Sequence, residues 1–124
     1  MFVSVQYVSA ITFAVREMAR AVEFYEQCGF AVVYGGRSAA FTSLRCAEAY
    51  INLIATPDYE PKWWGRAIIR VGSADEQYAR VDAAGLRPHA PPQDASWGER
   101  YFHITDSDGH ELSFAELLPP KRPA

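Results

Sequence analysis

The chain has few cysteines, no excess of basic residues and no long apolar run. Its 124 residues include 12 lysines and arginines against 15 aspartates and glutamates, which gives a formal net charge of −3. Nucleic-acid-binding proteins normally carry a clear basic excess, so this charge argues against a nucleic-acid partner. The longest apolar stretches fall well short of the roughly 20 residues that a membrane helix needs. We therefore expect neither nucleic acid nor a membrane as a partner.

The two cysteines and the N-terminal residues favour a cytoplasmic location. Cys28 and Cys46 lack the spacing of a metal site, and without a secretion signal we expect them to be reduced. Residues 1–15 are apolar but lack a basic start, and they alternate small polar with apolar side chains. We interpret them as a strand rather than a signal peptide.

Two segments, 16–29 and 73–85, carry the signals of helices. Apolar residues recur in both at intervals of three or four positions, and each segment ends at a glycine, which commonly closes a helix in a left-handed conformation. Ser73 and Glu76 form a capping box at the start of the second segment. The apolar residues of the two stripes are Met18, Ala21, Val22 and Tyr25, and Ala74, Tyr78 and Val81.

The two helical segments reveal a duplication. Gly29 of the first corresponds to Gly85 of the second, 56 positions later. One strand-like run precedes each helix and three follow it, judged by alternation and by β-branched or aromatic content. These runs are 11–15, 31–36, 39–45 and 49–55 in the first half, and 67–71, 85–90, 100–106 and 110–116 in the second. The order β-α-β-β-β thus occurs twice.

The duplication predicts an α+β fold in a single domain, 1–124. The half-modules cover residues 8–56 and 66–118, and residues 57–65 form the linker. Since one helix per half covers one face of its sheet, the other face needs the second half, a partner chain or a ligand as cover. We expect a curved mixed sheet with an open concave cleft, and a pocket in that cleft.

Segments 11–30 and 97–116 resemble the vicinal-oxygen-chelate superfamily, which includes glyoxalase I, extradiol dioxygenases, fosfomycin-resistance enzymes and bleomycin-resistance proteins. The resemblance spans residues 8–116, and its more specific part is 97–116, with an aromatic–glycine start, a D-x-D-G turn and a last strand ending in glutamate. The length also matches the small dimeric bleomycin-binding members. The resemblance implies a homodimer with its ligand at the dimer cleft, and an N-terminal strand, Met1 to Tyr7, that chains can exchange.

In the enzymes of this superfamily four inward strand positions hold a divalent metal, mostly through His and Glu. The resemblance places these positions on Ala10, Asn52, Arg66 and Ser113, converging on one hollow. None of these side chains is a good ligand for such a metal, and Arg66 repels a cation. We therefore expect no metal and no other cofactor, in keeping with the metal-free, bleomycin-resistance-like members.

Three residues are candidates for acid–base chemistry: His103, Glu111 and Tyr101. By resemblance, His103 matches an inward position that touches substrate in fosfomycin-resistance enzymes, and a histidine titrates near neutral pH. Its alternative role is a hydrogen-bonded wall of the pocket. Glu111 shares the strand parity of Ser113 and so faces the same cavity. The other two histidines, His89 and His110, are expected at the surface.

The inward strand positions and the tryptophans predict the ligand-binding residues. In bleomycin-binding relatives the tryptophan that corresponds to Trp97 stacks on a planar ligand group, and Trp63 and Trp64 are placed to form a rim. Packing in the core or in a dimer interface is the alternative for all three. The predicted set is Tyr50, Asn52, Trp64, Arg66, Ile68, Arg70, Trp97, Tyr101, His103 and Ser113.

The two arginines of this set leave the charge of the ligand open. Buried unpaired charges are unfavourable, so Arg66 and Arg70 need Glu111 or an anionic group of the ligand as partner. An anionic ligand and cationic bleomycin both remain possible from the sequence.

Four functions compete. The first is a metal-free binding protein that sequesters a small aromatic or hydrophobic molecule, as in antibiotic resistance. The second is a lyase or isomerase that uses His103, Glu111 or Tyr101 without a metal. The third is a glyoxalase- or dioxygenase-like enzyme with an atypically placed metal, and the fourth is a regulatory module, for which no feature speaks. One scaffold carries all of these activities, so resemblance of fold alone cannot choose among them. We favour the first, because the usual metal ligands are missing and the predicted site is rich in aromatic residues.

Overall fold

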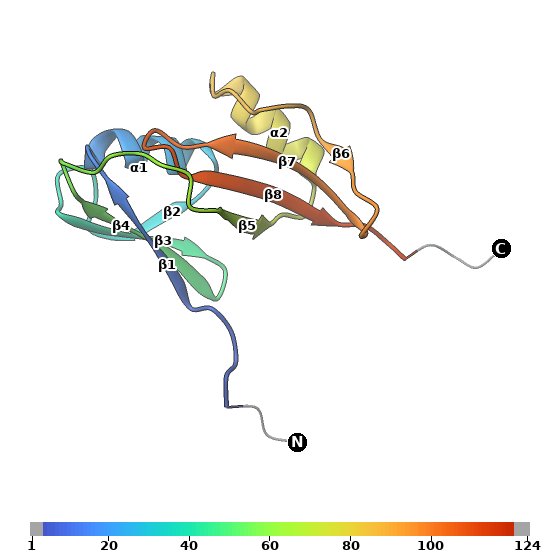
Figure 1. Cartoon of the computed structure of the whole chain (residues 1–124), viewed down its shortest axis with the longest axis horizontal. Coiled ribbons are helices and arrows are strands. Elements are labelled where there is room, and N and C mark those ends of the chain that lie inside the picture. Colours follow the sequence, from blue (N-terminus) through green and yellow to red (C-terminus); the bar gives the residue numbers. More distant parts are fainter. Residues whose placement is uncertain (1–3, 121–124) are drawn as a thin grey trace. The chain divides into compact units, whose positions relative to one another are not determined.

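The computed structural model describes residues 4–120, and the chain forms two compact units that divide between Glu60 and Pro61. We call them the first and the second module. Each consists of one helix and a four-stranded sheet of its own (Figure 1). The order β-α-β-β-β occurs in both, which confirms the predicted α+β fold of two repeated modules. Their union in a single domain stays a prediction.

Both modules use one topology. The elements of the first module are β1 (Ala10–Val15), α1 (Met18–Gln27), β2 (Ala31–Tyr34), β3 (Phe41–Cys46) and β4 (Ala49–Ala55). Those of the second are β5 (Arg66–Arg70), α2 (Ala74–Ala83), β6 (Gln93–Asp94), β7 (Glu99–Thr105) and β8 (Glu111–Leu117). The strand orders are β1-β4-β3-β2 and β5-β8-β7-β6. In each sheet the first pair is parallel and the others are antiparallel.

The two helices end in the same way, as the duplication predicts. Gly29 and Gly85 follow the last turns with φ angles of 101° and 83°. The N–H of the residue after each glycine donates to the carbonyl five positions earlier, at 3.0 Å in both helices. This is the Schellman arrangement, and glycine adopts the positive φ that it needs without strain. At the start of α2 the Ser73 hydroxyl accepts the N–H of Glu76 at 3.1 Å, as the capping box predicted.

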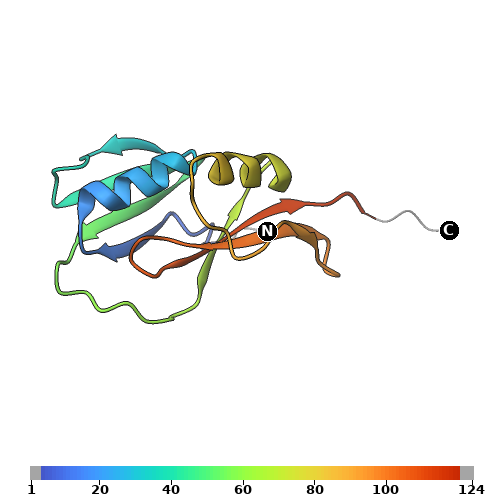
Figure 2. The same cartoon turned by 90° about the horizontal axis from the view of Figure 1, so that it is seen from above.

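Buried and exposed side chains alternate along most strands, so each sheet has a buried face toward its helix. Figure 2 shows α1 lying along the sheet of the first module. Tyr25 of α1 packs there against Phe13 of β1, with ring centroids 6.1 Å apart. In the second module Tyr78 of α2 meets Phe102 of β7 edge-on at 5.5 Å. On the helix side the buried strand residues are Phe13, Val15, Thr42, Leu44, Ile51 and Leu53 in the first module, and Ala67, Ile69, Phe102, Ile104, Leu112 and Phe114 in the second. Ser113 and Ala115 of β8 are buried on the opposite face.

One predicted strand is wrong. Residues 85–90 form no strand, and the second sheet is completed instead by the two-residue β6. Pro88, Pro91 and Pro92 explain the difference, because proline lacks the N–H that a strand ladder needs. A single backbone bond, from His89 N–H to the His103 carbonyl at 2.9 Å, joins this segment to β7.

Val5, Tyr7 and Val8 are exposed, and the first three residues of the Met1–Tyr7 segment lie outside the described residues, so its exchange between chains stays a prediction. No helix within residues 4–120 is both long enough and apolar enough to cross a membrane.

Candidate functional site

The face of the second sheet opposite α2 carries the predicted inward residues. Cross-strand register places Ile68 of β5, Ser113 of β8 and His103 of β7 side by side. The next row along is Arg70, Ala115 and Tyr101. The central strand β8 therefore contributes small side chains between longer ones on both sides. This difference in size creates a groove along β8, with Ser113 and Ala115 as its floor.

A hollow of about 150 Å³ lies in this groove. Its wall residues come from β5, β7, β8 and the turn before β7, and all belong to the second module. The residues that line it are Arg66, Ile68, Trp97, Glu99, Tyr101, His103 and Ser113. All but Glu99 belong to the predicted ligand-binding set. The parity of β7, which places Glu99, Tyr101 and His103 on one face of the sheet, is the signal that would have predicted Glu99.

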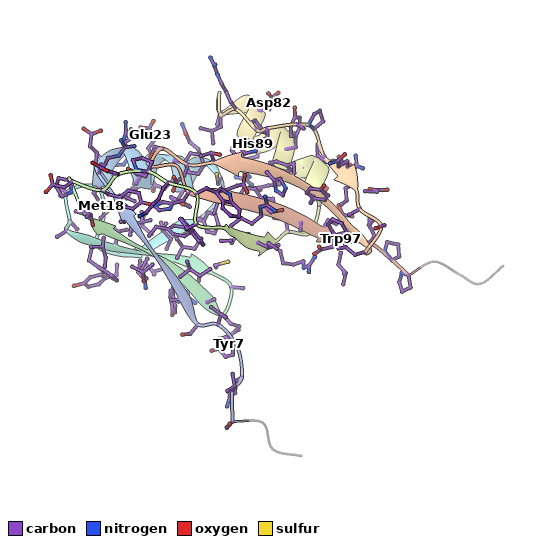
Figure 3. The ribbon with its side chains drawn as sticks, in the orientation of Figure 1. Tyr7, Met18, Glu23, Asp82, His89 and Trp97 are labelled. Atoms are coloured by element: carbon purple, nitrogen blue, oxygen red, sulfur yellow. The ribbon has the colours of Figure 1, made fainter. Side chains whose placement is uncertain are left out.

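Aromatic rings form one wall of the groove. Trp97 stacks on Tyr101 at a centroid distance of 5.9 Å with the planes 26° apart, and Tyr101 lies 5.1 Å from the ring of His103. Trp97 remains 68% exposed, yet its indole N–H donates to Glu99 at 2.8 Å. Figure 3 shows Trp97 at the end of the sheet where β7 begins. Gln93 donates to the Tyr101 hydroxyl at 2.9 Å, so the wall is fixed at two points.

Two ion pairs connect β5 to its neighbours along the groove. Arg66 Nε lies 2.5 Å from Glu111, and a terminal nitrogen of Arg70 lies 3.0 Å from Glu99. Each arginine therefore has a glutamate of this chain as its partner. The sequence left open whether Glu111 or a ligand anion pairs with the arginines, and the structure shows that glutamates pair with both.

The neighbours of Glu111 stabilise its carboxyl group in the ionised form. Burial alone would raise the pKa of its carboxyl group, but the hydrogen bond and positive charge of Arg66 outweigh burial and lower it. His103 and a hydrogen bond from Trp63 act in the same direction. Glu111 consequently stays ionised at neutral pH and is a weak base.

His103 has the opposite character. Burial, together with the charge of Arg66 and the neighbouring His89, lowers its pKa below 6.5, while Glu111 opposes the shift. Its Nδ1 is buried and has no hydrogen-bond partner among residues 4–120. The imidazole is therefore neutral at neutral pH. Of the three acid–base candidates, His103 is the one whose protonation state suits a base.

His89 and His110 lie in different surroundings. His89 is exposed as predicted, and its Nε2 lies 2.7 Å from the Thr105 hydroxyl. The prediction for His110 is wrong, because this residue is only 3% exposed. Its Nδ1 accepts the indole N–H of Trp64 at 2.8 Å. The Asp106 carboxylate, which accepts the backbone N–H of His110 at 2.9 Å, draws the turn inward.

Four predicted residues, Trp64, Arg70, Tyr50 and Asn52, lie apart from the lining of the hollow. Arg70 pairs with Glu99, which belongs to the lining. Trp64 donates its indole N–H to His110, and this hydrogen bond stabilises the turn between β7 and β8. Tyr50 and Asn52 belong to the first module, on the face of its sheet that α1 leaves free. There Tyr50 lies under the guanidinium of Arg45 at 5.2 Å, and Asn52 bonds to Ser43 and Thr12. Their part in a shared site with the second module stays a prediction.

The four positions that resemblance assigns to metal ligands carry side chains that cannot bind a metal ion well. Ala10 offers a methyl group, and Asn52 is engaged by its neighbours on both sides. Arg66 is a cation already paired with Glu111, and Ser113 supplies a neutral hydroxyl. Within the described part of the chain, no three His, Cys, Asp or Glu side chains gather in a way that could hold a metal ion. This donor set suits neither zinc nor the other divalent metals.

Comparison with known families decides the relationship. The model described as the Glyoxalase/Bleomycin resistance protein/Dioxygenase superfamily matches residues 7–114. The chain belongs to this superfamily. No curated protein matches its sequence.

Solved structures of low sequence identity share the fold. A bleomycin resistance determinant encoded on the transposon Tn5 is 23% identical with a TM-score of 0.76, over 90% of this chain and 98% of that one. A bleomycin-binding protein complexed with bleomycin gives the same identity and coverage with a TM-score of 0.72. Lactoylglutathione lyase from Agrobacterium tumefaciens is 14% identical with a TM-score of 0.70, over 91% of this chain and 95% of that one. These likenesses show the fold alone.

The lowered pKa of His103 predicts a loss of stability in mild acid. The unfolded chain takes up a proton near pH 6.5 while the folded chain resists it, so the free energy of unfolding should fall as the pH drops below about 6.5. His103→Gln should remove this part of the loss. Urea denaturation at about pH 7 and about pH 5 measures the difference. His89→Gln is the control and should keep most of the wild-type slope, because burial, the largest cause of the lowered pKa of His103, persists. An unchanged slope in His103→Gln would contradict the assignment.

Proposed function

We propose that the chain is a metal-free binding protein that sequesters a flat aromatic or hydrophobic small molecule in the groove along β8. The observation that carries this proposal is Trp97. A mobile exposed indole would be an ordinary surface residue, but this one is held by Glu99 and by stacking on Tyr101. An exposed aromatic face that is already oriented offers large contact area with little entropy left to lose on binding.

Two further observations support the same function. Ile68 is 61% exposed beside Trp97 in the lining of the hollow, and exposed apolar residues gathered around a depression are typical of ligand sites. One structure of the same fold is that of a bleomycin-binding protein complexed with bleomycin. A role in antibiotic resistance in the cytoplasm is consistent with this relative and is part of the proposal.

Binding in the groove is tested by nuclear magnetic resonance of the ¹⁵N-labelled chain. Bleomycin and flat two-ring aromatics are added, and the indole N–H signal of Trp97 is followed. We expect this signal to shift, and Trp97→Ala to weaken binding about fivefold, since loss of a stacking partner is worth roughly 1 kcal/mol. Tyr34→Ala is the matched control, because Tyr34 is 67% exposed but lies in the first module. If no compound shifts the groove signals, the proposed function is wrong.

We also propose that two chains form a homodimer that completes the site. The hollow of about 150 Å³ is smaller than the roughly 300–1,000 Å³ of complete small-molecule sites. Another surface is needed to enclose more than one flat ring system. Sedimentation of the purified chain should return twice its mass of 13.9 kDa; a monomer at all concentrations would refute the dimer.

A second function, a lyase or isomerase, is favoured by one observation. His103 is a neutral imidazole in the lining of the groove, next to the Tyr101 ring, where it can donate a proton to a bound molecule and take one back. Glu111 is a poorer candidate because Arg66 holds it ionised, and the Tyr101 hydroxyl already accepts a bond from Gln93. An enzyme would therefore depend mainly on His103.

The enzyme is tested by incubating the chain with lactoylglutathione, the compound named for one structural relative, and following its breakdown. Turnover that disappears in His103→Gln, while binding to the groove persists, would establish catalysis by His103. The Tyr101→Phe variant serves as control, since it keeps the ring and should retain turnover. Wild-type chain that binds ligands without turning over lactoylglutathione is the result expected of a binding protein.

A further inference from the structure

We propose that the groove selects an uncharged aromatic carbonyl compound, whose oxygen accepts hydrogen bonds from His103 Nε2–H and the Arg66 guanidinium while its ring lies against Tyr101 and Trp97. This inference rests on the proposed function, because it names the class of ligand that the same groove takes. It depends on the tautomer of His103, the orientation of Arg66 and the cancelled charge of the walls, together with the stacked rings of Trp97 and Tyr101.

The first step assigns the proton of His103. Its Nδ1 is enclosed and makes no hydrogen bond to the described residues. A buried N–H without an acceptor is rarer in proteins than a buried acceptor without a donor. The neutral ring therefore carries its proton on Nε2 and leaves Nδ1 bare. Since Nδ1 is enclosed, Nε2 is the nitrogen through which His103 contacts a molecule in the hollow, and it does so as a donor.

The surroundings of His103 agree with this tautomer. A second proton would have to sit on the enclosed Nδ1. The groups that face the ring are Arg66 from β5, Glu111 from β8 and His89 from the segment before β6. Two of these three disfavour the charged form, as burial does. The neutral donor tautomer is accordingly the state that meets a ligand.

The second step concerns Arg66. Its Nε is held by Glu111, which Trp63 anchors in turn. The terminal amino groups of Arg66 make no hydrogen bond within residues 4–120, and the guanidinium acts electrostatically on His103. Arg66 thus offers oriented donors at the end of the hollow nearest His103. The hydroxyl of Ser113, a residue that is 3% exposed, lies on the floor between the two walls.

The third step is the charge of the groove. Arg66 pairs with Glu111 and Arg70 with Glu99, so the walls carry no net charge. A carboxylate would give up its hydration and approach two glutamates without meeting an unpaired cation. An ammonium ion would find the Glu99 carboxylate already engaged by Arg70 and Trp97, and it would face the cationic guanidinium of Arg66. A carbonyl oxygen accepts these hydrogen bonds without either penalty, and conjugation to a ring keeps it in the plane of the stacked group.

The inference is tested by comparing three probes that share one ring system: 2-acetylnaphthalene, 2-ethylnaphthalene and 2-naphthoate. Their dissociation constants with the full chain are measured by resonance titration near pH 7.5. The ketone should bind about three- to tenfold more tightly than the ethyl compound, the usual worth of one or two net hydrogen bonds. It should also bind more tightly than the carboxylate.

Variants locate the effect. In His103→Phe the preference for the ketone over the ethyl compound should vanish, while 2-ethylnaphthalene binds as before. His103→Gln keeps an N–H donor and should restore part of the preference. Arg37→Gln is the matched control, because Arg37 forms an ion pair with Glu26 in the first module and takes no part in the groove, so the preference should survive. A two-bond ¹H–¹⁵N spectrum should also show the proton of His103 on Nε2.

The outcomes separate this inference from the proposed function. If all three probes bind in the groove with equal affinity, or the carboxylate binds most tightly, the groove remains a binding site and the carbonyl preference is refuted. A proton found on Nδ1 refutes it as well. If none of the probes shifts the Trp97 signal, both the proposed function and the ligand class fall.

Discussion

One helix can cover only one face of a four-stranded sheet, and the candidate site is a consequence of that limit. In the second module α2 packs on the face that bears Phe102 and Phe114. Because side chains alternate along a strand, every second residue of β5, β7 and β8 then points to the opposite face. That face holds Ile68 and His103, and its composition is free to serve binding because the core is built on the other side.

The depth of the groove depends on the central strand. Large residues at Ser113 and Ala115 would fill the space between β5 and β7 and give a flat surface. With small ones there, the arginines of β5 lie over the strand and reach glutamates on β8 and β7. Ion pairing inside the wall explains how two guanidinium groups border an apolar hollow without an external anion. The same pairs hold polar donors in fixed positions, which a hydrated surface arginine would not do.

The sequence predicted those parts of the molecule that depend on local periodicity. Apolar periodicity predicted both helices and their glycine ends. Strand parity, with its register taken from the resemblance, predicted the lining residues on β5, β7 and β8 except Glu99, and the resemblance itself predicted Trp97. Features set by contacts between distant segments were missed. Glu99 gains its role from Trp97 and Arg70, and His110 is buried because Asp106 and Trp64 draw it in. The segment 85–90 alternates like a strand, but the prolines around it prevent pairing.

Arg66 and Ser113 link the missing metal site to the chemistry of the groove. Resemblance to the superfamily assigns both positions to metal ligands, and a bound metal would attract an oxygen atom as a Lewis acid. A guanidinium and a hydroxyl attract an oxygen atom through hydrogen bonds, and His103 adds a third donor from the neighbouring strand. Hydrogen bonds orient a carbonyl group but polarise it far less than a divalent cation does. A site of this composition is therefore better suited to holding such a molecule than to transforming it.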